Sequence, residues 1–110
     1  MKIYCANSEY TLDDFIGEDA WVLTVSDSGS RRYLKILSKE PYGPCYIYHA
    51  NFIFMTWVNF FDDYAPNWSV EEALSRTIDV YDWEIYVYNP CHPDVYTTEE
   101  LIDKLERQLT

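Results

Sequence analysis

The most constraining feature of this sequence is its uncharged stretch, the 21 residues from Pro41 to Phe61 that contain no Asp, Glu, Lys or Arg. A largely apolar stretch of this length has to leave water, either in a membrane or in a protein core. Gly43, Pro44 and Asn59 interrupt it. A membrane helix tolerates such residues poorly, because its backbone groups must all be satisfied away from water. We therefore expect two buried elements with a turn between them, and no membrane partner.

The two halves of the uncharged stretch have different patterns. Cys45 to His49 follows the turn from Pro41 to Pro44 and is predicted to be a strand. Phe52 to Phe61 shows neither clean alternation nor a polar face at helical spacing. Its β-branched and aromatic residues favour a strand, and a helix remains the alternative.

Three other segments predict β-strands. Trp21 to Val25 alternates with one strongly apolar face, and a turn from Asp27 to Ser30 leads to a returning strand from Tyr33 to Ser38. Lys2 to Ala6 is a short apolar segment that we expect to form the first strand. In the segment from Asp82 to Tyr88, apolar residues alternate with acidic residues and tyrosines, as on a half-buried strand.

Short helices are predicted where an N-cap residue is followed three positions later by an acidic residue. The pairs are Thr11 with Asp14, Ser69 with Glu72, and Thr97 with Glu100. We expect the second helix to run through Arg76, after a loop from Asp62 to Asn67. The third opens the C-terminal helix, whose apolar stripe is Leu101, Ile102, Leu105 and Leu109.

These elements predict an α+β fold in a single domain, residues 1–110. We expect a curved antiparallel sheet of about five or six strands, or a small SH3-like barrel made from it, with two or three short helices. The chain has an odd number of cysteines, and its N-terminal segment MKIYCANSEY lacks the apolar core of a signal peptide. Both features favour a reducing, cytoplasmic location.

Residue types that can form a metal site or a nucleophile are present, but their spacing supports neither. Cys45 and His49 would share a strand face, and Cys91 and His92 follow in a loop, which is not the spacing of structural zinc modules. Cys91, His92 and Asp94 are sequence neighbours, whereas catalytic partners are normally brought together from distant positions. The three glycines are isolated and form no phosphate-binding loop. We expect no enzyme activity, no metal and no cofactor.

The charge of the chain limits its partners. It has 19 acidic and 8 basic side chains, a net charge of -11 and a pI near 4.3. Nucleic acids and anionic membranes require a basic surface, so neither is expected as a direct ligand. Residues 40–103 hold twelve acids and one base, whereas Arg31, Arg32, Lys35 and Lys39 lie close together. We expect a small basic patch opposite a broad acidic surface.

The acidic surface is the candidate binding site, because tyrosines are scattered among its carboxylates. Alternate carboxylates on a strand lie about 6.6 to 6.8 Å apart, close to twice the roughly 3.4 Å step between phosphates on a DNA strand. Tyrosines are enriched at protein interfaces and anchor them. The predicted partner-binding residues are Asp62, Asp63, Tyr64, Glu71, Glu72, Asp79, Tyr81, Asp82, Glu84, Tyr86 and Tyr88.

The small size, the acidic balance, the absence of enzyme motifs and the mixture of Tyr, Asp and Glu resemble the phage-encoded anti-CRISPR proteins, especially their DNA-mimic members. The segments KIYCANSEYTLDDFIGEDAWV and VYTTEEL are also similar to small phage proteins from gut bacteria. The resemblance implies a stoichiometric, non-enzymatic inhibitor that occupies the basic DNA-binding or motif-reading cleft of a Cas-type nuclease in the bacterial cytoplasm.

Two other functions fit the sequence. The apolar segment 52–61 or a sheet edge could bind a partner or a second copy of the chain, which leaves both monomer and dimer open. A protein that sequesters a small ligand is the other alternative, and it predicts an aromatic-lined pocket.

Overall fold

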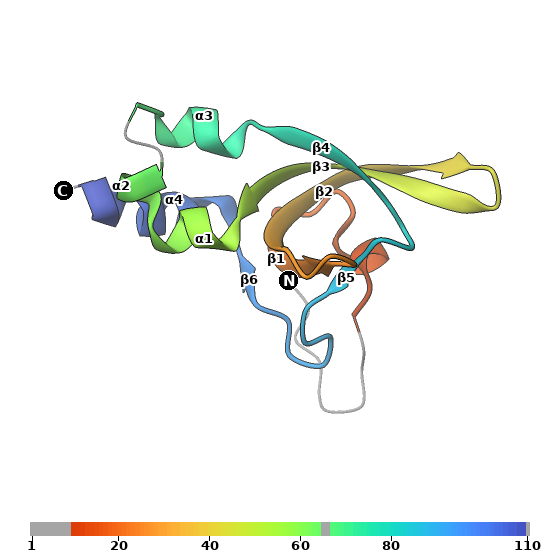
Figure 1. Cartoon of the computed structure of the whole chain (residues 1–110). Coiled ribbons are helices and arrows are strands. Elements are labelled where there is room, and N and C mark those ends of the chain that lie inside the picture. The colour runs from red at the N-terminus through yellow and green to blue at the C-terminus, as the bar shows by residue number, and fades with distance from the viewer. Residues whose placement is uncertain (1–9, 65–66, 110) are drawn as a thin grey trace.

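The computed structural model describes residues 10–64 and 67–109, and it has the predicted α+β architecture (Figure 1). The strands are β1 (Trp21–Ser26), β2 (Arg31–Tyr42), β3 (Cys45–Phe54), β4 (Thr77–Tyr81), β5 (Ile85–Val87) and β6 (Val95–Tyr96). The helices are α1 (Met55–Asn59), α2 (Phe61–Tyr64), α3 (Val70–Leu74) and α4 (Thr98–Glu106), with 3-10 turns η1 (Leu12–Phe15) and η2 (Arg107–Leu109). The predicted strand from Lys2 to Ala6 lies outside the described residues. Of the helices described, none has the length and apolar character that a bilayer span needs.

The strands form one curved antiparallel sheet in the order β4-β3-β2-β1-β5, with β6 pairing beside β5 on β1. Three residues, 82–84, connect β4 to β5 although these strands lie at opposite ends of the order. The sheet is therefore strongly curled. Because the hydrogen-bonded order ends at β4 and β5, it stays open and does not close into the expected SH3-like barrel.

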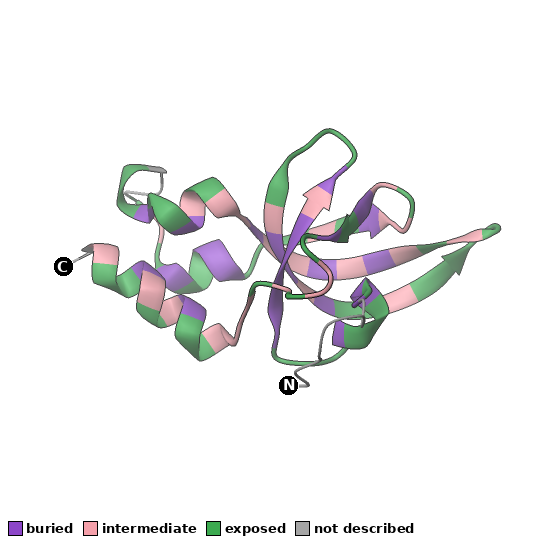
Figure 2. Ribbon diagram, turned by 90° about the horizontal axis from the view of Figure 1, so that it is seen from below, coloured by how far each residue is buried: buried purple, intermediate pink, exposed green. Residues whose placement is uncertain are grey.

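Two hydrophobic clusters occupy the two sides of this sheet. One lies inside the curled sheet and includes Phe15, Val22 and Ile36, and the other lies against the helices and includes Trp21 and Phe61. Strand β1 contributes to both clusters, so it is buried on both faces and not on one face as expected. Figure 2 shows the buried residues continuing from the sheet into the helices.

The segment from Phe52 to Phe61, for which both a strand and a helix were considered, contains the end of a strand followed by a helix. β3 continues to Phe54, and α1 begins at Met55, so the strand interpretation is right for three residues and wrong for the rest. Ile53, Val58 and Phe61 are fully buried. These three residues belong to the core between the sheet and the helices, whereas Thr56, Asn59 and Phe60 are exposed.

The predicted strand from Asp82 to Tyr88 is wrong over its first three residues, which form a turn. The Tyr81 amide donates to the Glu84 carboxylate at 3.0 Å, and the Glu84 amide donates to the Tyr81 carbonyl at 3.1 Å. These local bonds replace a strand ladder. Strand β4 was not predicted, because its residues follow Arg76 without a turn signal. The expected loop from Asp62 to Asn67 is also wrong in part, since α2 extends through Tyr64.

The predicted helix starts are confirmed. The Ser69 hydroxyl accepts from the Glu72 amide at 3.1 Å, and Thr97 and Glu100 form a reciprocal capping box. α3 ends at Leu74, two residues earlier than expected. Leu101 and Leu105 of the C-terminal stripe are fully buried, Ile102 is half-buried, and the Leu109 side chain lies outside the description.

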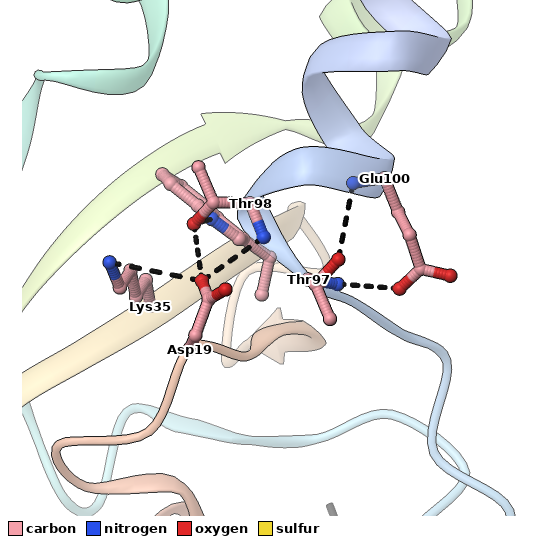
Figure 3. Close-up of polar contacts among 6 residues, drawn as sticks. Asp19, Lys35, Thr97, Thr98 and Glu100 are labelled. Atoms are coloured by element: carbon pink, nitrogen blue, oxygen red, sulfur yellow. Dashed lines mark hydrogen bonds and ion pairs between the residues drawn. The ribbon is translucent and has the colours of Figure 1, made fainter.

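A polar junction, formed by Asp19, Trp21, Lys35 and Thr98, fastens α4 to the sheet (Figure 3). The Thr98 hydroxyl donates to the Asp19 carboxylate and accepts from Trp21 Nε1 at 2.9 Å. The Thr98 amide also donates to Asp19, at 3.1 Å, and Lys35 Nζ lies 3.9 Å from the same carboxylate oxygen. The hydrogen bond from the Thr98 hydroxyl is the main reason that the pKa of Asp19 is lowered.

Candidate functional site

The predicted interface residues fall in three regions instead of one face (Figure 1). Asp62, Asp63, Glu71 and Glu72 are exposed on α2 and α3, Asp79 and Tyr81 lie on β4 with Glu84 in the following turn, and Asp82, Tyr86 and Tyr88 line a groove. Tyr64 belongs to α2, and its side chain is not described. The separation follows from the crossing between β4 and β5, which places residues 79–81 and 86–88 at opposite ends of the sheet. Because Asp82 and Glu84 lie in a turn, they do not provide the expected strand repeat of carboxylates.

The region that combines aromatic and acidic side chains is on the solvent side of β2, β3 and β4, and we call it the outer face. Strand pairing sets its composition: Ile47 is opposite both Glu40 and Tyr81, and His49 is opposite Asp79. Directly paired residues share a side of the sheet. The outer face consists of Glu40, Tyr42, Ile47, His49, Asp79, Tyr81 and Trp83, the last from the turn after β4.

Three aromatic rings form the centre of the outer face. The Tyr42 and Tyr81 ring centroids are 5.2 Å apart, and the Tyr81 and Trp83 rings stack at 4.4 Å with planes 17° apart. Tyr42 is 54% exposed and Trp83 is 58% exposed. Large aromatic side chains this exposed are concentrated at binding surfaces. The rings already support one another, so little side-chain freedom is left for a partner to remove.

Sequence reasoning found Tyr81 but missed Tyr42 and Trp83. Tyr42 was assigned to a turn, whereas β2 continues through it and the tight turn consists of Gly43 and Pro44. Trp83 alternates with buried Ile85 and Val87, which predicts an inward side chain on a continuous strand. The turn at 82–84 breaks that alternation and turns Trp83 outward. No sequence signal indicates this turn.

An ion-paired histidine lies on the same face. His49 Nδ1 is 2.6 Å from Asp79 Oδ1, and Nε2 is 3.1 Å from Glu40 Oε1. Carboxylates only accept hydrogen bonds, so this arrangement favours the imidazolium form, in which both ring nitrogens can donate. The hydrogen bond to Asp79, followed by the one to Glu40, raises the pKa of His49 above its ordinary value. With His49 charged, this trio carries one net negative charge.

The expected basic patch is neutralised only in part: its two lysines are ion-paired, whereas Arg31 and Arg32 form no ion pair among the described residues. Lys35 pairs with Asp19, and Lys39 pairs with Asp13 at 3.0 Å while lying 4.1 Å above the Tyr46 ring. Burial alone would raise the pKa of Asp13, but hydrogen bonds from Tyr48 and Lys39 outweigh it and lower the pKa. The lysines of β2 therefore neutralise neighbouring carboxylates.

A groove with a volume of about 760 Å³ is lined by described residues along β5. Its aromatic lining is Tyr10, Tyr48, Tyr86 and Tyr88, and its charged lining is Arg31 and Asp82. The groove is separate from the outer face, since it follows β5 and not β4.

The described residues form no group of side chains that could together bind a metal ion. Within residues 10–64 and 67–109, no three His, Cys, Asp or Glu side chains are grouped so that they could hold a metal ion. Cys45 and Cys91 are free thiols that are half-buried.

Comparisons with known proteins give no relative from which function can be transferred. No protein-family model matches the chain, and neither a curated protein nor a solved structure matches it. Function is therefore inferred from the outer face, the groove and the charge of this chain.

Proposed function

We propose that this chain is a non-enzymatic inhibitor whose outer face binds the basic nucleic-acid-binding cleft of a host defence nuclease of the Cas type. The observation that carries the proposal is the exposed stack of Tyr42, Tyr81 and Trp83 between carboxylates. Aromatic anchors of this kind contribute most of the free energy of binding at protein interfaces. Glu40, Asp79 and Glu84 give the surroundings of the stack an acidic character.

The charge of the whole chain supports a basic partner. A net charge of -11 repels nucleic acid and attracts proteins whose clefts are lined by Lys and Arg. The helices add exposed carboxylates away from the outer face, including Asp62, Asp63, Glu71 and Glu72. Such charges speed encounter with a basic partner without contacting it directly. The aromatic stack then provides short-range affinity, and the helices provide long-range steering.

The test is a binding titration against a panel of purified Cas-type nucleases loaded with guide RNA. We expect a stoichiometric complex whose affinity falls with added salt and which duplex DNA displaces. Trp83→Ala should weaken it by about 30-fold or more, the effect of losing an interface hot spot. Phe60→Ala is the matched control, because Phe60 is 53% exposed but lies at the end of α1.

Three results would contradict the proposal. They are the absence of binding across the panel, a complex that is indifferent to salt and DNA, and equal losses from Trp83→Ala and Phe60→Ala. Light scattering separately tests a homodimer through segment 52–61. The burial of Ile53, Val58 and Phe61 leaves Phe60 as the large apolar side chain that this segment exposes.

A further inference from the structure

The groove along β5 has the size and lining of a small-ligand site. Its volume of about 760 Å³ lies within the usual range of roughly 300 to 1,000 Å³ for ligand pockets. Leu12, Ile85 and Val87 give it an apolar interior, and each is nearly fully buried. Tyr86, on the other hand, is 60% exposed and lines the open side. The groove is thus apolar inside and accessible at its rim.

Strand pairing places a cation and an aromatic ring across the rim from one another. Val25 pairs with Arg31 on one side and with Tyr86 on the other, so the three side chains form a row across β2, β1 and β5. Neighbouring strands are about 4.8 Å apart, which sets Arg31 and Tyr86 roughly 10 Å from one another. That width matches a flat molecule of two fused rings with a charged substituent at one end.

Within the described part of the chain, Arg31 is held by an aromatic ring and not by a carboxylate. Its guanidinium lies 4.5 Å above the Tyr88 ring, which fixes its position. Among the described residues, no carboxylate lies within ion-pair distance of it, whereas Lys35 and Lys39 are both paired. A guanidinium held in place with free N–H groups is suited to bind a carboxylate, sulfonate or phosphate oxygen.

We propose that this groove binds a planar aromatic anion, with the rings along Tyr86 and the apolar interior and the anionic group on Arg31. Asp82 also lines the groove, where its carboxylate repels a second anionic group and can accept one N–H or O–H from the ring system. This site uses residues outside the outer face and is independent of the proposed inhibitor function. It would let a small metabolite bind while the outer face remains free.

The test compares two fluorescent probes that differ in one group: 8-anilinonaphthalene-1-sulfonate and neutral N-phenyl-1-naphthylamine. We expect the sulfonate to bind one site and to bind more tightly than the neutral probe. Arg31→Gln should weaken the sulfonate by about 10-fold or more, as expected for loss of a charge-assisted hydrogen bond, and leave the neutral probe unchanged. Tyr86→Ala should weaken both probes.

The control is Tyr42→Ala, which removes an exposed tyrosine from the outer face and should change neither affinity. Circular dichroism of each variant shows that the fold is intact, and both Arg31 and Tyr86 are exposed enough to replace safely. Equal affinity for the two probes, an unchanged sulfonate affinity in Arg31→Gln, or tighter binding of cationic thioflavin T would overturn the proposal.

Discussion

The sheet end and the helical end of this molecule carry similar negative charge but balance it differently. The sheet end, residues 10–54 and 77–96, has ten acidic and four basic side chains. The helical end, which consists of the other described residues, has eight acidic and three basic side chains. At the sheet end, Lys35, Lys39 and His49 pair with neighbouring carboxylates. At the helical end, Arg107 pairs with Asp103 at 2.7 Å, whereas Arg76 lies 3.9 Å above the Trp68 ring and Lys104 lies 5.9 Å from the Tyr96 ring of β6.

The two properties that we expect of a binding surface, exposed aromatic rings and exposed carboxylates, are therefore concentrated at different ends of the molecule. The sheet end exposes the stack of Tyr42, Tyr81 and Trp83 where much of the charge is paired, and the helical end exposes carboxylates around a single strongly exposed ring, Phe60, among its described residues. A single acidic, tyrosine-rich face, as expected from the sequence, is therefore not formed. Under the proposed function, contact affinity would come from the sheet end and long-range attraction from the helical end, and the following predictions test that division.

The largest expected effect contrasts a buried ring at the helical end with an exposed ring at the sheet end. Phe61 is fully buried, and Phe61→Ala should cost about 3 to 5 kcal/mol of unfolding free energy. Trp83→Ala loses ring stacking but creates no cavity, so its cost should be under about 1.5 kcal/mol. Urea denaturation of both variants measures the contrast. Comparable losses would mean that the outer-face stack is part of the core.

The junction between the two ends should give the next largest effect. Thr98→Val leaves Trp21 Nε1 and Asp19 without the hydroxyl that bonds to both, which should cost about 1 to 3 kcal/mol. Thr98→Ser keeps the hydroxyl and serves as the control. The lowered pKa of Asp19 adds a pH test: its contribution is present above the unfolded value of about 3.9 and is lost as pH falls through the lower folded pKa. Thr98→Val should reduce that acid-side loss.

Pairing at the sheet end can be tested through His49. Its pKa is raised in the folded state, so its stabilising contribution is complete below the unfolded value of about 6.5 and is lost as pH rises through the folded pKa. NMR titration of the imidazole should give a pKa above the ordinary value. His49→Gln should make stability independent of pH in this window. An ordinary pKa would show that the pairs with Glu40 and Asp79 do not persist in solution.

The smallest expected effect probes the negative charge at the end of α4, where Asp103 pairs with Arg107 at 2.7 Å and Glu106 has no ion pair among the described residues. Glu106 lies three residues after Asp103 at the end of α4, where carboxylates repel one another and oppose the helix dipole. Glu106→Lys should stabilise the protein by about 0.3 to 0.5 kcal/mol at low salt. Thermal denaturation at low and high salt measures this. A gain that survives high salt would point to packing instead of charge.

Local signals in the sequence predicted local structure well. Capping residues located the helix starts at Thr11, Ser69 and Thr97, and alternation identified β1 and its hairpin with β2. The antiparallel sheet and the terminal helix followed from these elements. The strand prediction failed at residues 55–59, which form a helix of five residues in which Val58 is buried and the polar Thr56 and Asn59 are exposed. So short a helix leaves no helical periodicity that can be recognised in the sequence.

The candidate site was less predictable than the fold. Asp79 and Tyr81, two of the predicted partner-binding residues, lie on one face of β4, a strand that the sequence did not predict. Tyr86 and Tyr88 line the groove, and Arg31, held above Tyr88, had been assigned to a basic patch. The turn at 82–84 places Tyr81 on the outer face and Tyr86 and Tyr88 in the groove. Hydrogen bonds of this turn involve Glu84, Asp27 and Tyr46. Only the folded sheet brings those residues together.

The short link between β4 and β5 has a consequence for the order of folding. Each of these strands pairs with a partner that must already be in place, β3 for β4 and β1 for β5, and neither serves as a template for the other. The hairpins formed by β1, β2 and β3 close between near neighbours in the sequence, so we expect them to form the folding nucleus. β5 would then join last, and the groove would exist only after the rate-limiting step. Mutations at Val87 should accordingly speed unfolding more than they slow folding.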